Sequence, residues 1–156
     1  MCPVETVSTD GRTWSISRDD LHALRSLTIA YARRLDRTAP GDVEALFTPD
    51  GVWDGRPAGF ERFEGAEALS VCFAQHKADV VQSATIATNQ LVAPFDGDEA
   101  AGWSYCRATT LLRSGSTRHD FLRISDVFAR VDQVWYFRQR VLTPLMPARL
   151  QPGQFP

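Results

Sequence analysis

The chain has 156 residues, of which 44% are hydrophobic and 23% charged, and its formal net charge is −2. This length suits one globular domain with its own core, and the mixing of 17 basic with 19 acidic residues argues against a nucleic-acid-binding protein. No apolar run reaches the roughly 18 residues of a membrane span, and the polar first residues lack a signal-peptide pattern. We therefore expect a cytoplasmic protein that does not contact a membrane.

Residues 1–16 are predicted to form a polar leader, and a long amphipathic helix is predicted to follow at about residues 18–37. Ser17 and Asp20 have the spacing of a capping box at the helix start. Pro40 and Gly41 end the helix. Its apolar side is formed by residues at three- and four-residue spacing, namely Leu21, Leu24, Leu27, Thr28, Tyr31 and Leu35.

The next elements are short. Asp42 is expected to cap a second helix that turns Val43, Leu46 and Phe47 inward. A turn is predicted at 48–51, a strand at 52–54, a loop at 55–62 and a third helix at about 64–75.

From Ser83 the pattern changes to four β-branched and aromatic segments joined by turns, at 83–95, 100–112, 118–131 and 134–142. Helices followed by hairpins predict an α+β domain. We expect the helices to pack in a curved antiparallel sheet, forming a cone with one internal pocket, over residues 17–142. Residues 143–156 contain four prolines and are predicted to be an extended tail.

Three cysteines occur, Cys2, Cys72 and Cys106, without any C-x-x-C motif. We expect free thiols in a reducing compartment. No cluster of histidine, cysteine and aspartate has the spacing of metal ligands, so neither a metal nor another cofactor is expected.

Two motifs resemble the SnoaL-like branch of the nuclear-transport-factor-2-like superfamily. They are D-V-E-A-L-F-T-P-D-G-V-W at 42–53 and W-Y-F-R-Q-R-V at 135–141. Asn89, the turn at 96–98 and Asp126 also match positions common in that family. The resemblance covers about residues 18–142. It implies a cone with one deep apolar pocket, and often a homodimer formed through the open face of the sheet.

The family's enzymes include scytalone dehydratase, bile-acid dehydratases, ketosteroid isomerases, epoxide hydrolases and polyketide cyclases. It also has members that bind ligands or proteins without catalysis. Membership of this family therefore does not decide the function.

Tyr31 and Asp36 have the Tyr-x4-Asp spacing of the dehydratase-like members. A tyrosine facing a pocket can donate a hydrogen bond to a carbonyl, and an acid in an apolar pocket can move protons. The alternative is a core tyrosine beside an aspartate that is satisfied at the helix end. We take Asp36 as the candidate acid/base and Tyr31 as the candidate donor.

The resemblance implies a histidine four residues before Asn89, but Thr85 occupies that position. The Tyr/Asp/His set of the dehydratases is therefore incomplete. Thr85 and Asn89 are predicted to share one strand face and to form a polar wall. His119, next to Asp120 in a strand, is a candidate for the missing base.

Asp126 lies between Ile124 and Phe128 on one strand face. It is predicted either to pair with Asp36 across the pocket or to form a buried ion pair with Arg138 or Arg140. Arg107 is a candidate oxyanion donor or counter-ion. The aromatic candidates for the pocket wall are Trp53, Trp103, Tyr105 and Phe121, for which core or dimer packing is the alternative.

These features predict a cofactor-independent enzyme that acts on a small apolar organic substrate, such as a polyketide-like intermediate. The reaction would be an acid/base-assisted cyclisation, isomerisation or dehydration, and the missing histidine favours cyclisation, where the shape of the pocket can supply much of the rate. The alternatives are a non-catalytic ligand-binding protein and a dimeric interaction module.

Overall fold

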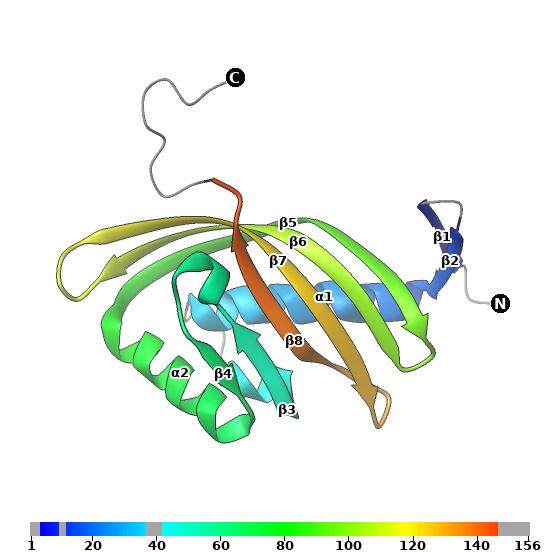
Figure 1. The fold of residues 1–156 in the computed structure, drawn as a ribbon, viewed down its shortest axis with the longest axis horizontal. Helices are drawn as coiled ribbons and strands as arrows, with labels where there is room; N and C mark the ends of the chain where they lie inside the picture. Colours follow the sequence, from blue (N-terminus) through cyan, green and yellow to red (C-terminus); the bar gives the residue numbers. More distant parts are fainter. Residues whose placement is uncertain (1–3, 10–11, 37–41, 147–156) are drawn as a thin grey trace, which may run out of the picture.

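A computed structural model describes residues 4–9, 12–36 and 42–146, with the backbone alone for 4–9, 12–14 and 94–96. Two helices and eight strands are present in this part of the chain (Figure 1). The helices are α1 (Arg18–Leu35) and α2 (Ala66–Asp79). The strands are β1 (Val4–Thr9), β2 (Arg12–Ser17), β3 (Phe47–Asp54), β4 (Arg62–Glu64), β5 (Val80–Asp96), β6 (Glu99–Leu112), β7 (Thr117–Val131) and β8 (Val134–Pro144).

Helix α1 begins as its sequence predicts. The Ser17 hydroxyl accepts a hydrogen bond from the backbone N–H of Asp20 at 3.0 Å, which satisfies one free donor of the first turn. The helix ends at Leu35 with Asp36 as its C-cap, slightly before the predicted end. The predicted stop at Pro40 and Gly41 lies outside the described residues.

Six strands form one sheet in the order β4-β3-β8-β7-β6-β5. Every neighbouring pair is antiparallel except β3 and β8, which run parallel, so the sheet is mixed rather than purely antiparallel. A parallel pair needs a long connection, and α2 lies in the chain between β3 and β8. The α+β class is as predicted.

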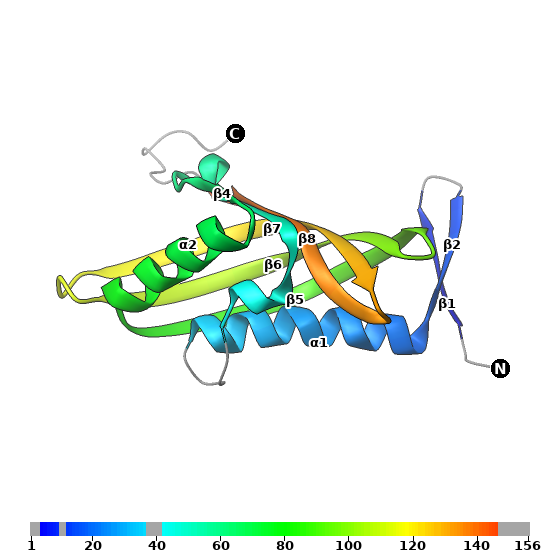
Figure 2. The same ribbon diagram turned by 90° about the horizontal axis from the view of Figure 1, so that it is seen from below.

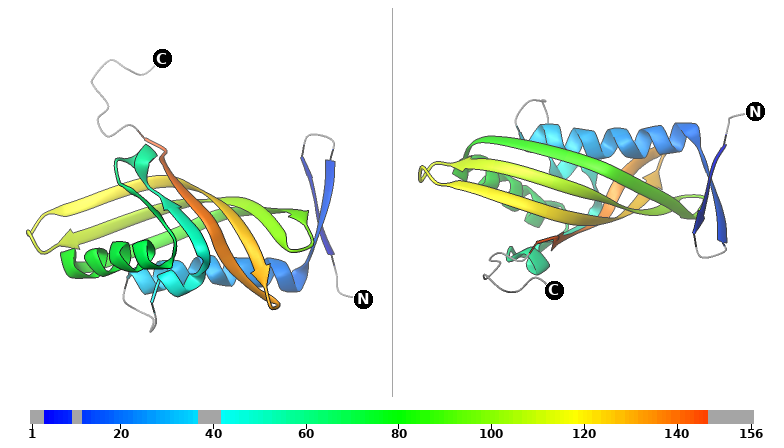
Figure 3. Two further views of the ribbon diagram at one scale, coloured as in Figure 1. Left: turned by 60° about the horizontal axis from the view of Figure 1, so that its bottom comes forward. Right: turned by 90° about the horizontal axis from the view of Figure 1, so that it is seen from above.

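The sheet curves over both helices. Figure 2 shows β5, β6 and β7 arching along the length of α1, with α2 beside it, and Figure 3 shows the two helices on the same side of the sheet. Fully buried residues such as Leu24, Leu69, Phe128 and Phe137 fill the space between the layers. In the described part of the chain, no helix is long and apolar enough to cross a membrane.

Four segments differ from the sequence-based expectations. The predicted second helix is a single 3-10 turn, Glu44–Leu46, whose N-cap is Val43 rather than Asp42. Part of the predicted leader forms the antiparallel hairpin β1–β2, which projects beyond the end of α1 (Figure 1). The predicted turn at 48–51 lies inside β3, where the register with β8 shifts between Phe47 and Val52. The predicted loop at 55–62 contains a one-turn 3-10 helix, Arg56–Ala58, and the start of β4. Each is short or irregular, so its periodicity is too weak to identify.

Candidate active site

A cavity of about 580 Å³ lies between the two helices and the inner face of the sheet. This volume is within the range of small-molecule sites. Its apolar wall includes the aromatic residues Tyr31, Trp53, Phe60, Phe63 and Phe73 and the aliphatic residues Leu122, Ile124 and Leu142. Its polar groups include Ser83, Thr85, Thr110, Arg118 and Asp120. Mostly apolar walls with a few polar groups suit a small, largely apolar ligand.

Tyr31 stands at the centre of the aromatic wall. Its ring meets those of Phe47, Phe73 and Phe137 edge-on, at centroid distances of 6.3, 6.2 and 5.8 Å. The Trp53 Nε1–H donates a hydrogen bond to the Tyr31 hydroxyl oxygen at 2.9 Å. Burial raises the pKa of Tyr31 to about 12. The phenol is therefore neutral near pH 7, and no described residue accepts its proton.

A buried cation lies behind Tyr31. The guanidinium carbon of Arg140 is 4.2 Å from the Tyr31 ring centroid and 3.9 Å from that of Phe137. Asp126 accepts two hydrogen bonds from Arg140, at 2.7 and 2.8 Å, and both side chains are 1% exposed. Asp126 therefore forms the buried ion pair, not a couple with Asp36, and neither member lines the cavity.

Asp36 joins the end of α1 to strand β5. Its carboxylate accepts hydrogen bonds from the Thr85 backbone N–H at 2.8 Å and from the Thr85 hydroxyl at 2.7 Å. Thr85 lines the cavity, whereas Asp36 lies behind it. Because the Thr85 hydroxyl donates a hydrogen bond to Asp36, its oxygen remains an acceptor. The Ser83 hydroxyl lies 3.5 Å from that oxygen.

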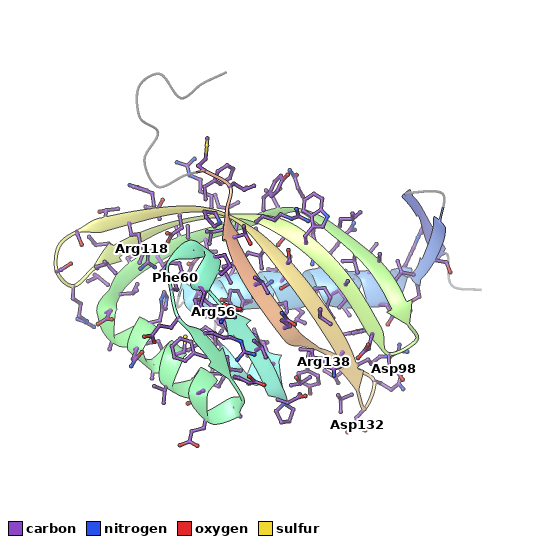
Figure 4. The ribbon with its side chains drawn as sticks, viewed as in Figure 1. Arg56, Phe60, Asp98, Arg118, Asp132 and Arg138 are labelled. Atoms are coloured by element: carbon purple, nitrogen blue, oxygen red, sulfur yellow. The ribbon has the colours of Figure 1, made fainter. Side chains whose placement is uncertain are left out.

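The carboxylate-bearing residues of the cavity wall are Glu61, Asp79 and Asp120, none of which is predicted from the sequence. Asp120 is the one that lies on the sheet, in β7. Its side chain is 17% exposed, and its Oδ2 accepts a hydrogen bond from Arg118 Nε at 2.8 Å. Arg118 lies over the Phe60 ring, 5.0 Å from its centroid (Figure 4). The alternation that placed Asp126 inward also places Asp120 inward, so this signal was available in the sequence.

Thr85, Ala108 and Asp120 lie side by side on three neighbouring strands. Thr85 pairs with Ala108 across β5 and β6, and Ala108 pairs with Asp120 across β6 and β7. All three line the cavity. The row thus has a polar group at each end and a methyl group in the middle.

Five predicted site residues lie on strand faces that do not line the cavity: Arg107, Trp103, Tyr105, His119 and Phe121. Side chains alternate along a strand, and on β6 and β7 the other set, including Cys106, Ala108 and Leu122, faces inward. The five therefore do not reach a ligand in the cavity. Instead, Trp103 packs on Tyr105 with ring centroids 5.2 Å apart, and His119 Nδ1 lies 3.1 Å from the Thr109 hydroxyl.

Asn89 does not share the face of Thr85. Its backbone has φ 54°, and the register of β5 with β6 shifts between Thr88 and Leu91. This is a β-bulge, whose extra residue breaks the alternation between Thr85 and Asn89. The Asn89 side chain is exposed and accepts a hydrogen bond from Thr88.

Two thiols line the cavity, those of Cys72 and Cys106. Burial raises the pKa of each to about 11, so both are protonated near pH 7 and are poor nucleophiles. Within the described ranges, no group of three or more His, Cys, Asp or Glu residues is arranged to hold a metal ion.

The helices, the curved sheet and the cavity between them define a cone of the nuclear-transport-factor-2-like kind. The family model of the SnoaL-like domain matches residues 7–141, and the chain belongs to this family. The match begins inside the segment predicted as a leader. No curated protein matches the chain.

Several solved structures are similar to this chain. One is a candidate aromatic ring hydroxylase from Novosphingobium aromaticivorans, with 26% identity, a TM-score of 0.80, and coverage of 85% of this chain and 93% of its own. A candidate scytalone dehydratase from the same species has 19% identity, a TM-score of 0.74 and coverage of 82% and 85%. A type 2 hexachlorocyclohexane dehydrochlorinase has 16% identity, a TM-score of 0.71 and coverage of 88% and 96%. The last two show a shared fold.

Proposed function

We propose that the protein is a cofactor-independent enzyme that transfers a proton on a small, largely apolar, polyketide-like substrate, in a cyclisation, isomerisation or dehydration. One observation carries this proposal. Tyr31 lines the cavity, and its hydroxyl oxygen accepts a hydrogen bond from Trp53 Nε1–H at 2.9 Å, so the hydroxyl is already used as an acceptor and not as a donor. The phenol proton is therefore available to a ligand. A carbonyl oxygen bound there gains negative charge when the neighbouring carbon loses a proton, and a fixed donor stabilises that charge.

The surroundings of Tyr31 favour this role. Its ring is held by three other aromatic rings and by Arg140, so the hydroxyl has a fixed direction. Its pKa of about 12 keeps it protonated while it donates. A donor that is already in place needs no reorganisation during the reaction.

Two of the similar structures are named for elimination reactions, a dehydration and a dehydrochlorination. Both reactions remove a proton from the substrate, which agrees with the proposed class of chemistry. The cavity also contains carboxylate and hydroxyl groups, whereas a purely apolar lining would favour a ligand-binding protein.

A cyclic ketone fused to an aromatic ring, 2-tetralone, tests the proposal without knowledge of the natural substrate. The protons beside its carbonyl exchange with solvent deuterium only after one is removed, and proton NMR measures the rate. We expect the protein to accelerate this exchange above the buffer rate. Binding without exchange would support the ligand-binding alternative, and no exchange with any ketone of a tetralone and decalone panel would contradict the proposal.

Filling the cavity provides a control for the place of the reaction. Ala108→Phe puts a large side chain into the cavity, whereas Ala84→Phe puts the same side chain on the exposed face of β5. We expect the exchange to be lost in the first variant and kept in the second. Equal rates in both variants would place the exchange elsewhere on the protein.

The homodimer implied by the resemblance stays a prediction. The outward-facing residues Ile86, Leu111 and Phe121 are 62, 38 and 44% exposed in the single chain. Sedimentation equilibrium of the wild type and of Phe121→Glu tests this prediction. We expect the wild type to form a dimer, and we expect the glutamate of the variant to weaken that dimer.

A further inference from the structure

The row formed by Thr85, Ala108 and Asp120 has the geometry of a slot across the cavity wall. Neighbouring strands are about 4.8 Å apart, so the backbones at the two ends of the row are roughly 10 Å apart. Ala108 projects only a methyl group between them. A flat ligand can therefore lie over Ala108, with Thr85 at one edge and Asp120 at the other.

The two ends of the slot differ chemically. Asp120 uses Oδ2 to bind Arg118, and no described residue donates a hydrogen bond to its Oδ1. Oδ1 is thus available as a base. The Thr85 hydroxyl donates its hydrogen bond to Asp36, so towards a ligand its oxygen can act only as an acceptor. A substrate hydroxyl group can donate to that oxygen.

Tyr31 belongs to the same neighbourhood as both ends. Cys106 lies two residues before Ala108 on the inner face of β6. Cys106 and Tyr31 line the cavity together with both ends of the row. The donor, the base and the acceptor therefore all line this one cavity.

We propose that Asp120 is the catalytic base and that Thr85, held by Asp36, orients the substrate through a hydroxyl group on the edge opposite to the reacting carbon. This inference rests on the proposed function and adds a substrate class: flat cyclic ketones that carry such a hydroxyl. Asp36, the acid/base predicted from the sequence, acts here through Thr85 and is a positioning residue.

The reaction balances with these groups alone. Asp120 Oδ1 takes a proton from the carbon beside the carbonyl, and the electron pair of the broken C–H bond moves onto the carbonyl oxygen, which Tyr31 hydrogen-bonds. In an isomerisation, Asp120 returns the proton to a different carbon. In a dehydration, the carbonyl re-forms, the C–O bond of a β-hydroxyl breaks, and that oxygen takes the proton from Asp120 and leaves as water.

The deuterium-exchange assay, run with 2-tetralone and 6-hydroxy-2-tetralone, separates the two roles. We expect Asp120→Asn to lower kcat for both ketones by about 100-fold or more, with little change in KM. Thr85→Val should raise KM for the hydroxylated ketone alone. The matched controls Asp50→Asn and Thr88→Val change exposed residues away from the cavity and should match wild type. Asp120→Ser replaces Asp120→Asn if the latter does not fold.

The possible results are distinct. Wild-type kcat in a folded Asp120 variant would overturn the inference while leaving the proposed function intact. Loss of kcat in Asp36→Asn, with Asp120→Asn fully active, would overturn it in favour of Asp36 as the base. An absence of exchange by wild-type protein would overturn the proposed function, and this inference with it.

Discussion

Thr85 donates two hydrogen bonds to the carboxylate of Asp36, one from its backbone N–H at 2.8 Å and one from its hydroxyl at 2.7 Å. The pair joins the C-terminal end of α1 to β5 at the edge of the cavity. It anchors the helix to the sheet and fixes the direction of the Thr85 hydroxyl. The predicted catalytic acid thus has a defined structural partner.

The Thr85–Asp36 contact is expected to contribute to stability. Thr85→Val keeps the backbone hydrogen bond but removes the one from the hydroxyl. Because Asp36 is only partly buried, we expect a loss of about 1–2 kcal/mol in the free energy of unfolding, measured with urea. Thr88→Val, an exposed change on the same strand, is the control and should lose much less. Equal stability of the two variants would show that the hydroxyl bond contributes nothing.

The buried pair of Arg140 and Asp126 predicts strong non-additivity. Asp126→Leu leaves the Arg140 charge buried without its counter-ion, and we expect a loss of about 3–5 kcal/mol. The double variant Asp126→Leu/Arg140→Met removes both charges and should be more stable than Asp126→Leu alone. Urea unfolding of the wild type, both single variants and the double variant measures the coupling. If the double variant lost as much free energy of unfolding as the two single variants lose together, the ion pair would have no coupling, which would contradict this prediction.

Alkaline pH should destabilise the protein through two buried acids, Tyr31 and Cys106, and the partly buried Cys72. Burial raises the pKa of Tyr31 from 10.0 to about 12, and those of Cys72 and Cys106 from 9.0 to about 11. The folded chain holds these protons more tightly than the unfolded chain does. Their contribution to the free energy of unfolding is therefore complete below pH 9 and is lost as the pH rises through the pKa values of the folded chain. Each group adds a slope of about 1.4 kcal/mol per pH unit while only the unfolded chain ionises.

Urea unfolding at a series of pH values measures this loss. We expect the free energy of unfolding to fall between pH 9 and pH 12. The double variant Cys72→Ala/Cys106→Ala should remove the part of the decline that begins near pH 9, and Tyr31→Phe the part that begins near pH 10. A flat profile over this range in the wild type would contradict the burial of these protons.

Much of the fold follows from sequence periodicity, whereas the inward face of β6 does not. Its sequence alternates the large residues Trp103 and Tyr105 with the small residues Ser104 and Cys106. Residue size alone favours the large aromatic rings as the cavity wall, but the small residues face inward. The concave face must leave room for two helices and a cavity, which favours small residues there. Periodicity alone does not show which of the two alternating sets faces inward.

Residue spacing predicted some site contacts and missed others. Tyr31 and Trp53 were each selected from sequence, but their mutual hydrogen bond depends on the packing of α1 against β3. The bulge at Asn89 adds one residue to β5, which reverses the faces of the residues that follow it, such as Leu91 and Val92. Asp120 lies at the polar start of the strand predicted at 118–131, where Arg118, His119 and Asp120 give no apolar alternation to mark the inward face.

The variant Tyr31→Phe tests the central claim most directly, because it removes the proposed donor and keeps the ring, although it also removes the acceptor of the Trp53 Nε1–H hydrogen bond. The measurement is the rate of deuterium exchange into 2-tetralone, with the affinity for 2-naphthol determined in parallel to show that the cavity is intact. We predict that the rate falls by about 100- to 1,000-fold while the affinity changes little. A rate equal to that of wild type, in a variant that still binds 2-naphthol, would contradict the role of Tyr31 and the function proposed for this cavity.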